Sequence, residues 1–184
     1  MTIQERYEWA CKDPDIGVLV PVLRKYGEQC QHITEFGVRD GVSTSAWLAA
    51  PFPQHAMSKK IVCYDIGRYP SVDEIANLAS GAGIDFEFYH QNTAEAVIEP
   101  TDLLFIDTVH NANQLNCELS NHRQVSKIII MHDTHTYGVD GEGPDTPGLW
   151  QAIIKFLDIE PRWRILEVRP ESNGLTVLQR ICPQ

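Results

Sequence analysis

Two uninterrupted apolar runs constrain the fold of this chain more than any other feature. Residues 103–106 (Leu-Leu-Phe-Ile) and 128–131 (Ile-Ile-Ile-Met) contain no polar side chain, which suits strands buried on both faces of a sheet. Such strands are typical of parallel sheets that helices cover on either side. Each run ends on polar residues, Asp107 after the first and His132-Asp133 after the second. We therefore expect a mostly parallel sheet with a polar edge.

The other segments alternate between helix and strand patterns. Helices are predicted at 3–11, 16–28, from Ser43 or Thr44 to the prolines at 51 and 53, and at 73–79, 112–122 and 149–157; further strands are predicted at 32–36, 61–64 and 86–89. Asn173-Gly174, between the apolar segments 163–168 and 175–181, predicts a terminal hairpin. The pattern indicates an α/β fold with a Rossmann-like, doubly wound, mostly parallel sheet and a C-terminal antiparallel hairpin. We expect one domain over 1–184, with N-terminal helices in 1–30 and the Rossmann-like core in 31–184.

Composition excludes several classes of partner. A formal net charge of -10 disfavours a nucleic-acid partner, which normally requires a basic face. No stretch approaches the ~20 apolar residues of a membrane span, and the N-terminus lacks a signal-peptide pattern. The five cysteines form no CxxC pair and are expected to be reduced thiols. We expect a cytoplasmic protein; Trp47, Trp150 and Trp163 could serve either its core or a homo-oligomer interface.

The loop after the first predicted strand carries the main binding signal. Gly37 and Gly41 permit tight turns and close approach of the backbone to a ligand. The G-x-G-x-x-G fingerprint and the phosphate loop are both absent, so a nucleoside without a diphosphate is the favoured ligand, and a nicotinamide-dependent oxidoreductase is disfavoured. Asp65, at the end of the second core strand, is placed to accept hydrogen bonds from ribose hydroxyls. The alternative is a turn followed by a helix cap.

A second group of residues follows the two apolar runs. If those strands are neighbours, Asp107 and Asp133 converge and offer oxygen ligands that suit Mg²⁺, Mn²⁺ or Ca²⁺. His110 can face the same cavity and take a substrate proton. Alternatively, the two carboxylates cap the following helix or loop. His110, His132, Asp133 and His135 could also form the zinc site of a metal-dependent hydrolase, although His132 and Asp133 point to opposite faces unless the strand has already turned.

Together these motifs resemble the class I S-adenosylmethionine-dependent methyltransferases. The matching pieces are Glu35-x-Gly37-x-x-x-Gly41-x-Ser43-Thr44, the strand end at Asp65, Leu104-Phe105-Ile106-Asp107-x-x-His110 and Ile129-Ile130-Met131-His132-Asp133-Thr134. With the hairpin they cover roughly residues 31–181. The branch they resemble contains the cephalosporin-hydroxylase-like and macrolide-sugar O-methyltransferases, described as methyltransferase domain 24-like.

The resemblance implies a role for each matching position. Gly37, Gly41, Ser43 and Thr44 would hold the methionine part of the cofactor, Glu35 would order the loop, and Asp65 would bind the ribose. Gln91 and Asn92 would lie near the adenine. Asp107 would touch the cofactor and, with Asp133, bind Mg²⁺ or another divalent cation, while His110 would act as the base. In the metal-dependent members an acidic or amide residue is expected beside the last metal ligand, and this chain departs from that pattern with His132. His132 is a further candidate metal ligand.

The resemblance implies an O-methyltransferase that acts on a hydroxyl of a small molecule, such as a sugar or a glycosylated metabolite. Two alternatives remain: a cofactor-binding module without catalysis, and the metal-dependent hydrolase. The chain lacks long insertions that would enclose an acceptor, so the N-terminal helices, the 136–148 loop or a second subunit must bound that pocket.

Overall fold

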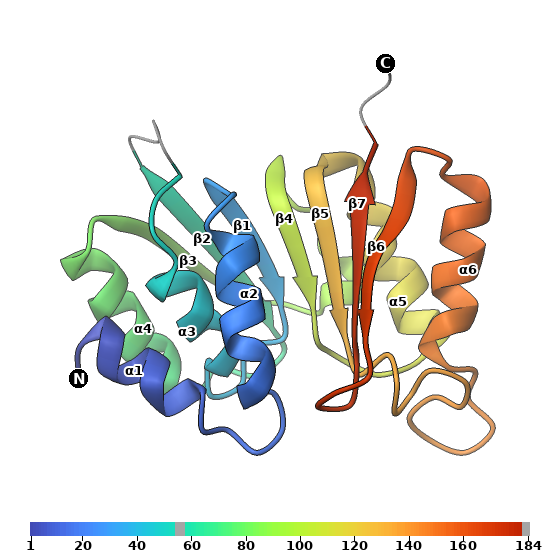
Figure 1. The fold of residues 1–184 in the computed structure, drawn as a ribbon, viewed down its shortest axis with the longest axis horizontal. Coiled ribbons are helices and arrows are strands. Elements are labelled where there is room, and N and C mark those ends of the chain that lie inside the picture. Colours follow the sequence, from blue (N-terminus) through green and yellow to red (C-terminus); the bar gives the residue numbers. More distant parts are fainter. Residues whose placement is uncertain (54–57, 182–184) are drawn as a thin grey trace.

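The computed structural model describes residues 1–53 and 58–181, and a seven-stranded sheet forms its centre (Figure 1). The strand order is β3-β2-β1-β4-β5-β7-β6. The strands are β1 (His32–Phe36), β2 (Lys59–Asp65), β3 (Ile84–His90), β4 (Thr101–Ile106), β5 (Val125–His132), β6 (Trp163–Arg169) and β7 (Leu175–Arg180). The first five strands run parallel, and β7 is antiparallel to both β5 and β6. The predicted mostly parallel sheet with a terminal hairpin is therefore confirmed.

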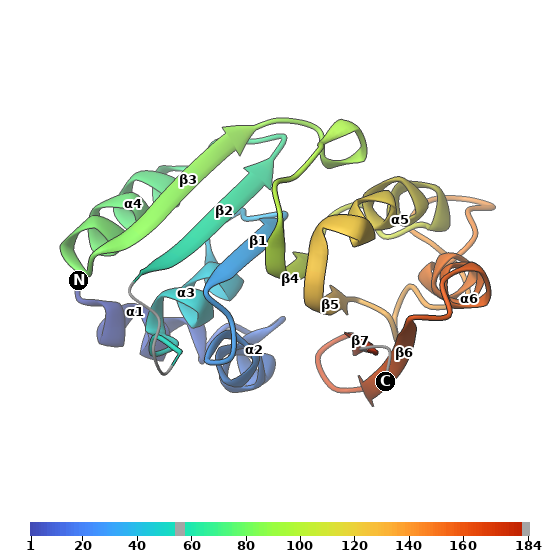
Figure 2. The same cartoon turned by 90° about the horizontal axis from the view of Figure 1, so that it is seen from above.

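Helices cover both faces of the sheet (Figure 2). The helices α1 (Ile3–Ala10), α2 (Val20–Gly27), α3 (Val42–Ala49) and α4 (Pro70–Gly81) pack on one face, and α5 (Ala112–Leu119) and α6 (Leu149–Ile159) pack on the other. Short 3₁₀ turns lie at Gly17–Leu19, Thr93–Glu95 and Ser120–Gln124. The helices predicted at 16–28 and 112–122 are thus each divided between an α-helix and a 3₁₀ turn, which is a frequent form of a helix end.

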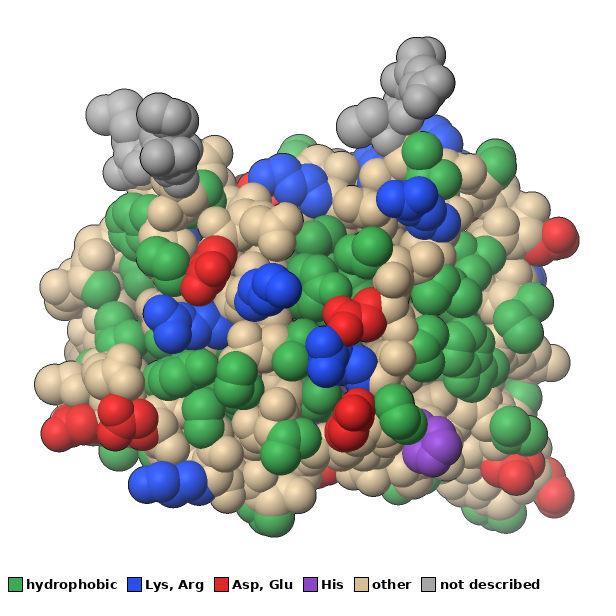
Figure 3. Space-filling model, viewed as in Figure 1, with side chains coloured by type: hydrophobic (Ala, Val, Ile, Leu, Met, Phe, Trp, Pro, Cys, Tyr) green, Lys and Arg blue, Asp and Glu red, His purple; other side chains and the backbone are tan. Residues whose placement is uncertain are grey.

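The two apolar runs are buried on both sides, as predicted. Leu103 and Phe105 contact the core under α1–α4, whereas Leu104 and Ile106 contact the core under α5 and α6. This alternation follows from the period of two along a strand. Trp47 and Trp163 are buried in these two cores, so neither offers surface for an interface. Exposed apolar side chains on β6 and α6 include Ile154, Ile165, Leu166 and Val168, and others such as Trp9, Val18 and Tyr69 lie elsewhere. Figure 3 shows apolar side chains over several parts of one face.

Two composition-based expectations can be compared with the structure directly. Among the described residues, no helix is long and apolar enough to cross a membrane. Cys11, Cys30, Cys63 and Cys117 are free thiols, whereas Cys182 lies outside the described residues.

Candidate cofactor cleft and histidine–carboxylate cluster

The strand register brings the predicted site residues into one row at the carboxyl edge of the sheet. Phe36 on β1 is the register partner of both Tyr64 on β2 and Ile106 on β4, and Ile106 is in turn the partner of Met131 on β5. The residues that directly follow these four partners are therefore neighbours in space. The resulting row contains Asp65, Gly37, Asp107 and His132. It lies where the strand order reverses direction, between β1 and β4, which is the usual ligand site of such sheets.

Gly37 holds the loop against the end of β4. Its φ is +85°, and its amide donates to Tyr64 O at 2.9 Å. A Cβ atom built at this position would lie 1.8 Å from the backbone oxygen of Asp107. Only glycine fits here, because both the conformation and the space exclude a side chain. Gly41, with φ +72°, is similarly confined by Ile75.

Glu35 lies beneath this loop, and its carboxyl group is fully buried. It accepts hydrogen bonds from the Ser43 hydroxyl, from Thr44 Oγ1 at 2.7 Å and from Cys63 Sγ at 3.4 Å. Both hydroxyls for which the resemblance implies a contact with the cofactor therefore face Glu35 in this structure. Thr44 is 0% exposed, whereas Ser43 still borders a cavity. These contacts tie the start of α3 to β1.

Asp65 fixes the other side of the loop. Its Oδ2 accepts hydrogen bonds from the backbone amides of Val38 at 2.7 Å and Arg39 at 3.0 Å, and its Oδ1 accepts one from Gly67 N at 2.8 Å. A carboxylate offers about four lone-pair positions, so one acceptor position remains for a ligand. The structure therefore shows that Asp65 shapes the loop, a contact that the sequence did not reveal.

Two cavities lie along the row and share Gly37, Arg39 and Asp107. The first, of about 270 Å³, is also bordered by the segment 13–16 and Ser43. The second, of about 330 Å³, is also bordered by Asp65, Tyr69, Asn92, Thr93, His110 and Gln114. Together they form a cleft that runs across the ends of β1, β2 and β4.

The two residues predicted near the adenine separate in the structure. Asn92 borders the second cavity, and its Oδ1 accepts the amide of Ala94 at 3.1 Å. Gln91 is exposed and borders a different depression, with Lys60 and Tyr89. Of the pair, only Asn92 joins the cleft.

Asp107, His110 and Asp133 converge at the end of the cleft. Each offers a possible ligand atom, and these atoms all lie within 4.8 Å of one another. His110 Nε2 is 2.8 Å from Asp133 Oδ2 and 3.5 Å from Asp107 Oδ1. The predicted convergence of two carboxylates and one histidine is present in the structure.

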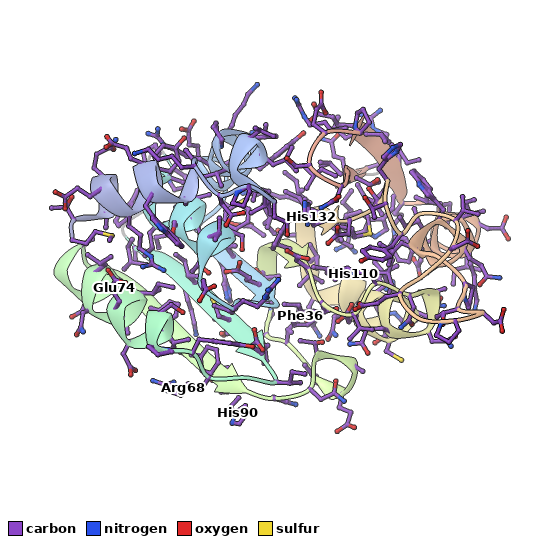
Figure 4. The ribbon with its side chains drawn as sticks, turned by 90° about the horizontal axis from the view of Figure 1, so that it is seen from below. Phe36, Arg68, Glu74, His90, His110 and His132 are labelled. Carbon is purple, nitrogen blue, oxygen red and sulfur yellow. The ribbon has the colours of Figure 1, made fainter. Side chains whose placement is uncertain are left out.

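His132 completes this cluster (Figure 4). Its Nδ1 lies 3.1 Å from Asp133 Oδ2 and 3.5 Å from Asp107 Oδ2, while its Nε2 contacts Ser172 O at 2.8 Å. His132 and Asp133 reach the same point because the backbone turns at Asp133, whose φ is +60°. Without this turn, the side chains of His132 and Asp133 would point to opposite faces of the strand. His135 is exposed and lies beside the hairpin tip, outside the cluster.

Two partners of His110 come from the loop that follows β5. Glu142 Oε2 lies 3.1 Å from His110 Nδ1, and the ring of Tyr137 stacks on the imidazole with centroids 4.7 Å apart. Histidines that bind metals or act as bases are commonly oriented by such a second carboxylate. The sequence did not predict either residue, because the segment 136–148 that contains both has no periodic pattern from which the direction of its side chains could be predicted.

Attraction between the two carboxylates and the two imidazoles sets the protonation of the cluster. Burial alone would lower the pKa of each imidazole, but Asp107 and Asp133 outweigh it and raise the pKa of His110 and of His132 to about 10. Burial alone would raise the pKa of Asp107 and Asp133, but their contacts with the two histidines hold both pKa values below the ordinary one. The carboxylates therefore attract positive charge to this point.

Comparison with known proteins supports the fold. No family model matches the chain, and no curated protein matches its sequence. Among solved structures, the Podospora anserina methyltransferase PaMTH1 bound to S-adenosylhomocysteine has a TM-score of 0.65 and 19% identity, over 98% of this chain and 88% of that one. The O-methyltransferase TomG of Streptomyces achromogenes, involved in tomaymycin synthesis and complexed with S-adenosylmethionine, has a TM-score of 0.66 and 14% identity, over 97% and 90%.

An N-methyltransferase is also similar. The Burkholderia thailandensis 1,6-didemethyltoxoflavin-N1-methyltransferase, with S-adenosylhomocysteine bound, has a TM-score of 0.61 and 12% identity, over 97% of this chain and 83% of that one. The chain therefore has the class I methyltransferase fold. At these identities the likeness establishes the fold alone, and the activity must be argued from the site.

Proposed function

We propose that this chain is an S-adenosylmethionine-dependent methyltransferase that acts on a hydroxyl of a small molecule with the help of a divalent cation. One observation carries the proposal: Asp107 borders both cavities of the cleft and also belongs to the histidine–carboxylate cluster. A cofactor that spans the cleft would therefore place its reactive centre beside groups able to bind a cation and accept a proton.

The two cavities fit the two halves of the cofactor. Asp65, Asn92 and Thr93 border the second cavity and offer the acceptors and amide that a nucleoside requires. Ser43 and the backbone at Gly37 border the first cavity, which suits the amino-acid half. The methyl-bearing sulfur lies between these halves of the cofactor, so in this arrangement it would lie next to Asp107.

The cluster fits a divalent cation by its donor atoms. His132 Nδ1 is buried and has no hydrogen-bond partner among the described residues, although it faces two carboxylates. Because Nε2 can donate its hydrogen to Ser172 O, Nδ1 would present a lone pair to a cation that displaces the proton held there by the two carboxylates. Asp107, His132 and Asp133 would hold the ion. An imidazole in this set suits Mn²⁺ or another transition metal as well as Mg²⁺.

His110 is the candidate base. When bound, the cofactor supplies an electrophilic methyl group and the cation would lower the pKa of the acceptor hydroxyl. Glu142 Oε2 lies 3.1 Å from His110 Nδ1 without a hydrogen bond between them, and its negative charge favours a hydrogen on Nδ1, which leaves Nε2 to take the acceptor's proton. Positive charge in the cleft would repel the imidazolium and so lower the raised pKa of His110, which is the direction that a base requires.

The segments that border the histidine–carboxylate cluster favour a small methyl acceptor. The cluster is bordered by the 13–16 segment, the loop containing Glu142 and the hairpin tip at Ser172, which are all short segments. The His-Asp pair at the end of β5 favours the cephalosporin-hydroxylase-like and macrolide-sugar branch, and with it a sugar-type hydroxyl. A cofactor-binding module without catalysis would have the cleft without a working cluster.

Calorimetric titration with S-adenosylhomocysteine tests the cofactor. We expect the wild type to bind and Asp65→Asn to bind roughly tenfold or more weakly, because a charged hydrogen-bond acceptor is lost. Asp85→Asn, an exposed change on β3, serves as the control and should bind like the wild type. No binding by the wild type at millimolar ligand would contradict the proposal.

Titration with Mn²⁺, followed by electron paramagnetic resonance, tests the cation. The wild type should bind one ion, and Asp133→Asn should bind it at least tenfold more weakly, because a charged ligand is removed. Asp158→Asn on the exposed face of α6 is the control. Equal affinities in wild type and Asp133→Asn would leave the cluster as an internal ion network and remove the cation from the proposal.

A further inference from the structure

The structure contains a buried carboxylate that the proposed reaction does not use. Glu118 on α5 is 0% exposed. Its Oε1 accepts hydrogen bonds from Thr93 Oγ1 at 2.7 Å, Thr108 Oγ1 at 2.7 Å and Gln114 Nε2 at 2.9 Å. The donors come from three segments: the 3₁₀ turn after β3, the loop after β4, and α5. All three donor side chains border the cavity that contains Asp65, which we assign to the nucleoside.

Glu118 determines which end of the Gln114 side chain faces that cavity. Gln114 Nε2 also donates to Thr93 Oγ1 at 3.0 Å, so both of its hydrogens are used away from the cavity. Turning the carboxamide round would place its oxygen against the oxygen of Glu118, where neither can donate. In the described part of the chain, no hydrogen bond reaches Gln114 Oε1. Gln114 therefore offers the cavity an acceptor.

Asn92 borders the same cavity but offers it a hydrogen-bond donor, whereas Gln114 offers an acceptor. Its Oδ1 already accepts the backbone amide of Ala94 at 3.1 Å, which leaves Nδ2 as the group that can donate. The cavity thus presents one side-chain acceptor, from Gln114, and one side-chain donor, from Asn92. Both orientations are set by hydrogen bonds within the protein.

We propose that Glu118 is a positioning residue that, through Gln114, makes the nucleoside cavity selective for adenine. The inference rests on the proposed function, because it takes this cavity to hold the nucleoside of the cofactor. Adenine carries an amino donor beside ring-nitrogen acceptors, which complements Gln114 Oε1 and Asn92 Nδ2. Hypoxanthine carries a carbonyl oxygen in place of the amino group, so it would set two acceptors against each other. Unpaired polar groups of this kind are a strong source of discrimination.

The test compares the affinities for S-adenosylhomocysteine and S-inosylhomocysteine by calorimetry. The wild type should prefer the adenine form by roughly 10- to 100-fold. In Glu118→Leu the acceptor that holds the Gln114 amide group is removed, so Gln114 can turn and donate into the cavity, and we expect the preference to fall to within about threefold. Gln114→Leu removes the acceptor and should reduce the preference similarly. Asn116→Ala on the same helix, where the Asn116 amide contacts Ala112 O, is the control and should keep the wild-type ratio.

The ratio of affinities separates positioning from a merely structural effect, because general loosening weakens both ligands alike. Equal binding of the two ligands by the wild type, or an unchanged ratio in either Glu118→Leu or Gln114→Leu, would overturn the inference while leaving the cofactor proposal intact. If Glu118→Leu does not fold, as judged by circular dichroism, the same comparison is made with Glu118→Met, which also lacks the carboxylate acceptor. Failure of the wild type to bind either ligand would overturn the proposed function and this inference with it.

Discussion

At the scale of single residues, the buried carboxyl group of Glu35 carries a clear electrostatic cost. Burial raises its pKa to about 7, although the hydrogen bonds from Ser43, Thr44 and Cys63 act in the opposite direction. The ordinary glutamate pKa of 4.5 applies in the unfolded chain. Between these two pH values the folded protein keeps a proton that the unfolded chain releases. The contribution of Glu35 to stability therefore falls as the pH rises from 4.5 to 7.

This linkage predicts how Glu35→Gln behaves. The two pKa values differ by about 2.5, so the contribution of Glu35 to the free energy of unfolding should decline by up to about 3 kcal/mol over that range. The glutamine side chain of the variant does not titrate, so urea unfolding should show a smaller decline for the variant than for the wild type. The difference between the two proteins should be constant above pH 8. Parallel stability curves from pH 4.5 to 7 would contradict the account of Glu35.

At the scale of elements, the hairpin tip between β6 and β7 supports the histidine–carboxylate cluster. Ser172 O contacts His132 Nε2, and Asn173 O accepts the backbone amides of His135 at 2.8 Å and Thr136 at 2.9 Å. Gly174 makes this contact possible: its φ is +101°, and a Cβ atom there would lie 2.3 Å from His135 N. The hairpin therefore helps to set the imidazole orientation in the cluster.

Gly174→Ala should disturb the cluster while sparing the nucleoside cavity. We expect a loss of at least about 1–2 kcal/mol in the free energy of unfolding from the left-handed conformation alone, together with weaker Mn²⁺ binding and unchanged binding of S-adenosylhomocysteine. Gly83→Ala is the matched control, because Gly83 has φ +70° but no neighbouring atom within 4 Å of its Cβ position. It should lose stability without losing Mn²⁺ affinity. If Gly174→Ala binds Mn²⁺ like the control, the hairpin does not position His132.

The elements were largely predictable from the sequence, whereas several site contacts were not. The runs at 103–106 and 128–131 predicted buried strands because their burial is a property of the side chains themselves. The convergence of Asp107 and Asp133 could also be predicted, because neighbouring parallel strands end at the same edge of a sheet. Glu142, Tyr137 and Ser172 could not be found in this way. The first two lie in a loop without periodicity, and Ser172 contributes a backbone oxygen, which no residue type reveals.

At the scale of the whole molecule, the strand order explains why one cleft can serve both binding and chemistry. The chain runs outward from β1 through β2 to β3, then crosses back to β4 and continues to β5. The loop after β1, which we propose binds the cofactor, and the first cluster residue therefore meet at the reversal, where Asp107 N donates to Phe36 O at 2.9 Å. The proposed nucleoside cavity lies toward β2 and β3, and the cluster lies toward β5.

A crystal structure of the complex with S-adenosylhomocysteine and Mn²⁺ tests this account most directly. It should show the ribose at Asp65, the adenine between Asn92 and Gln114, the sulfur beside Asp107, and the ion held by Asp107, His132 and Asp133. A nucleoside bound in the separate depression near Lys60 and Tyr89, or a sulfur turned away from Asp107, would contradict it.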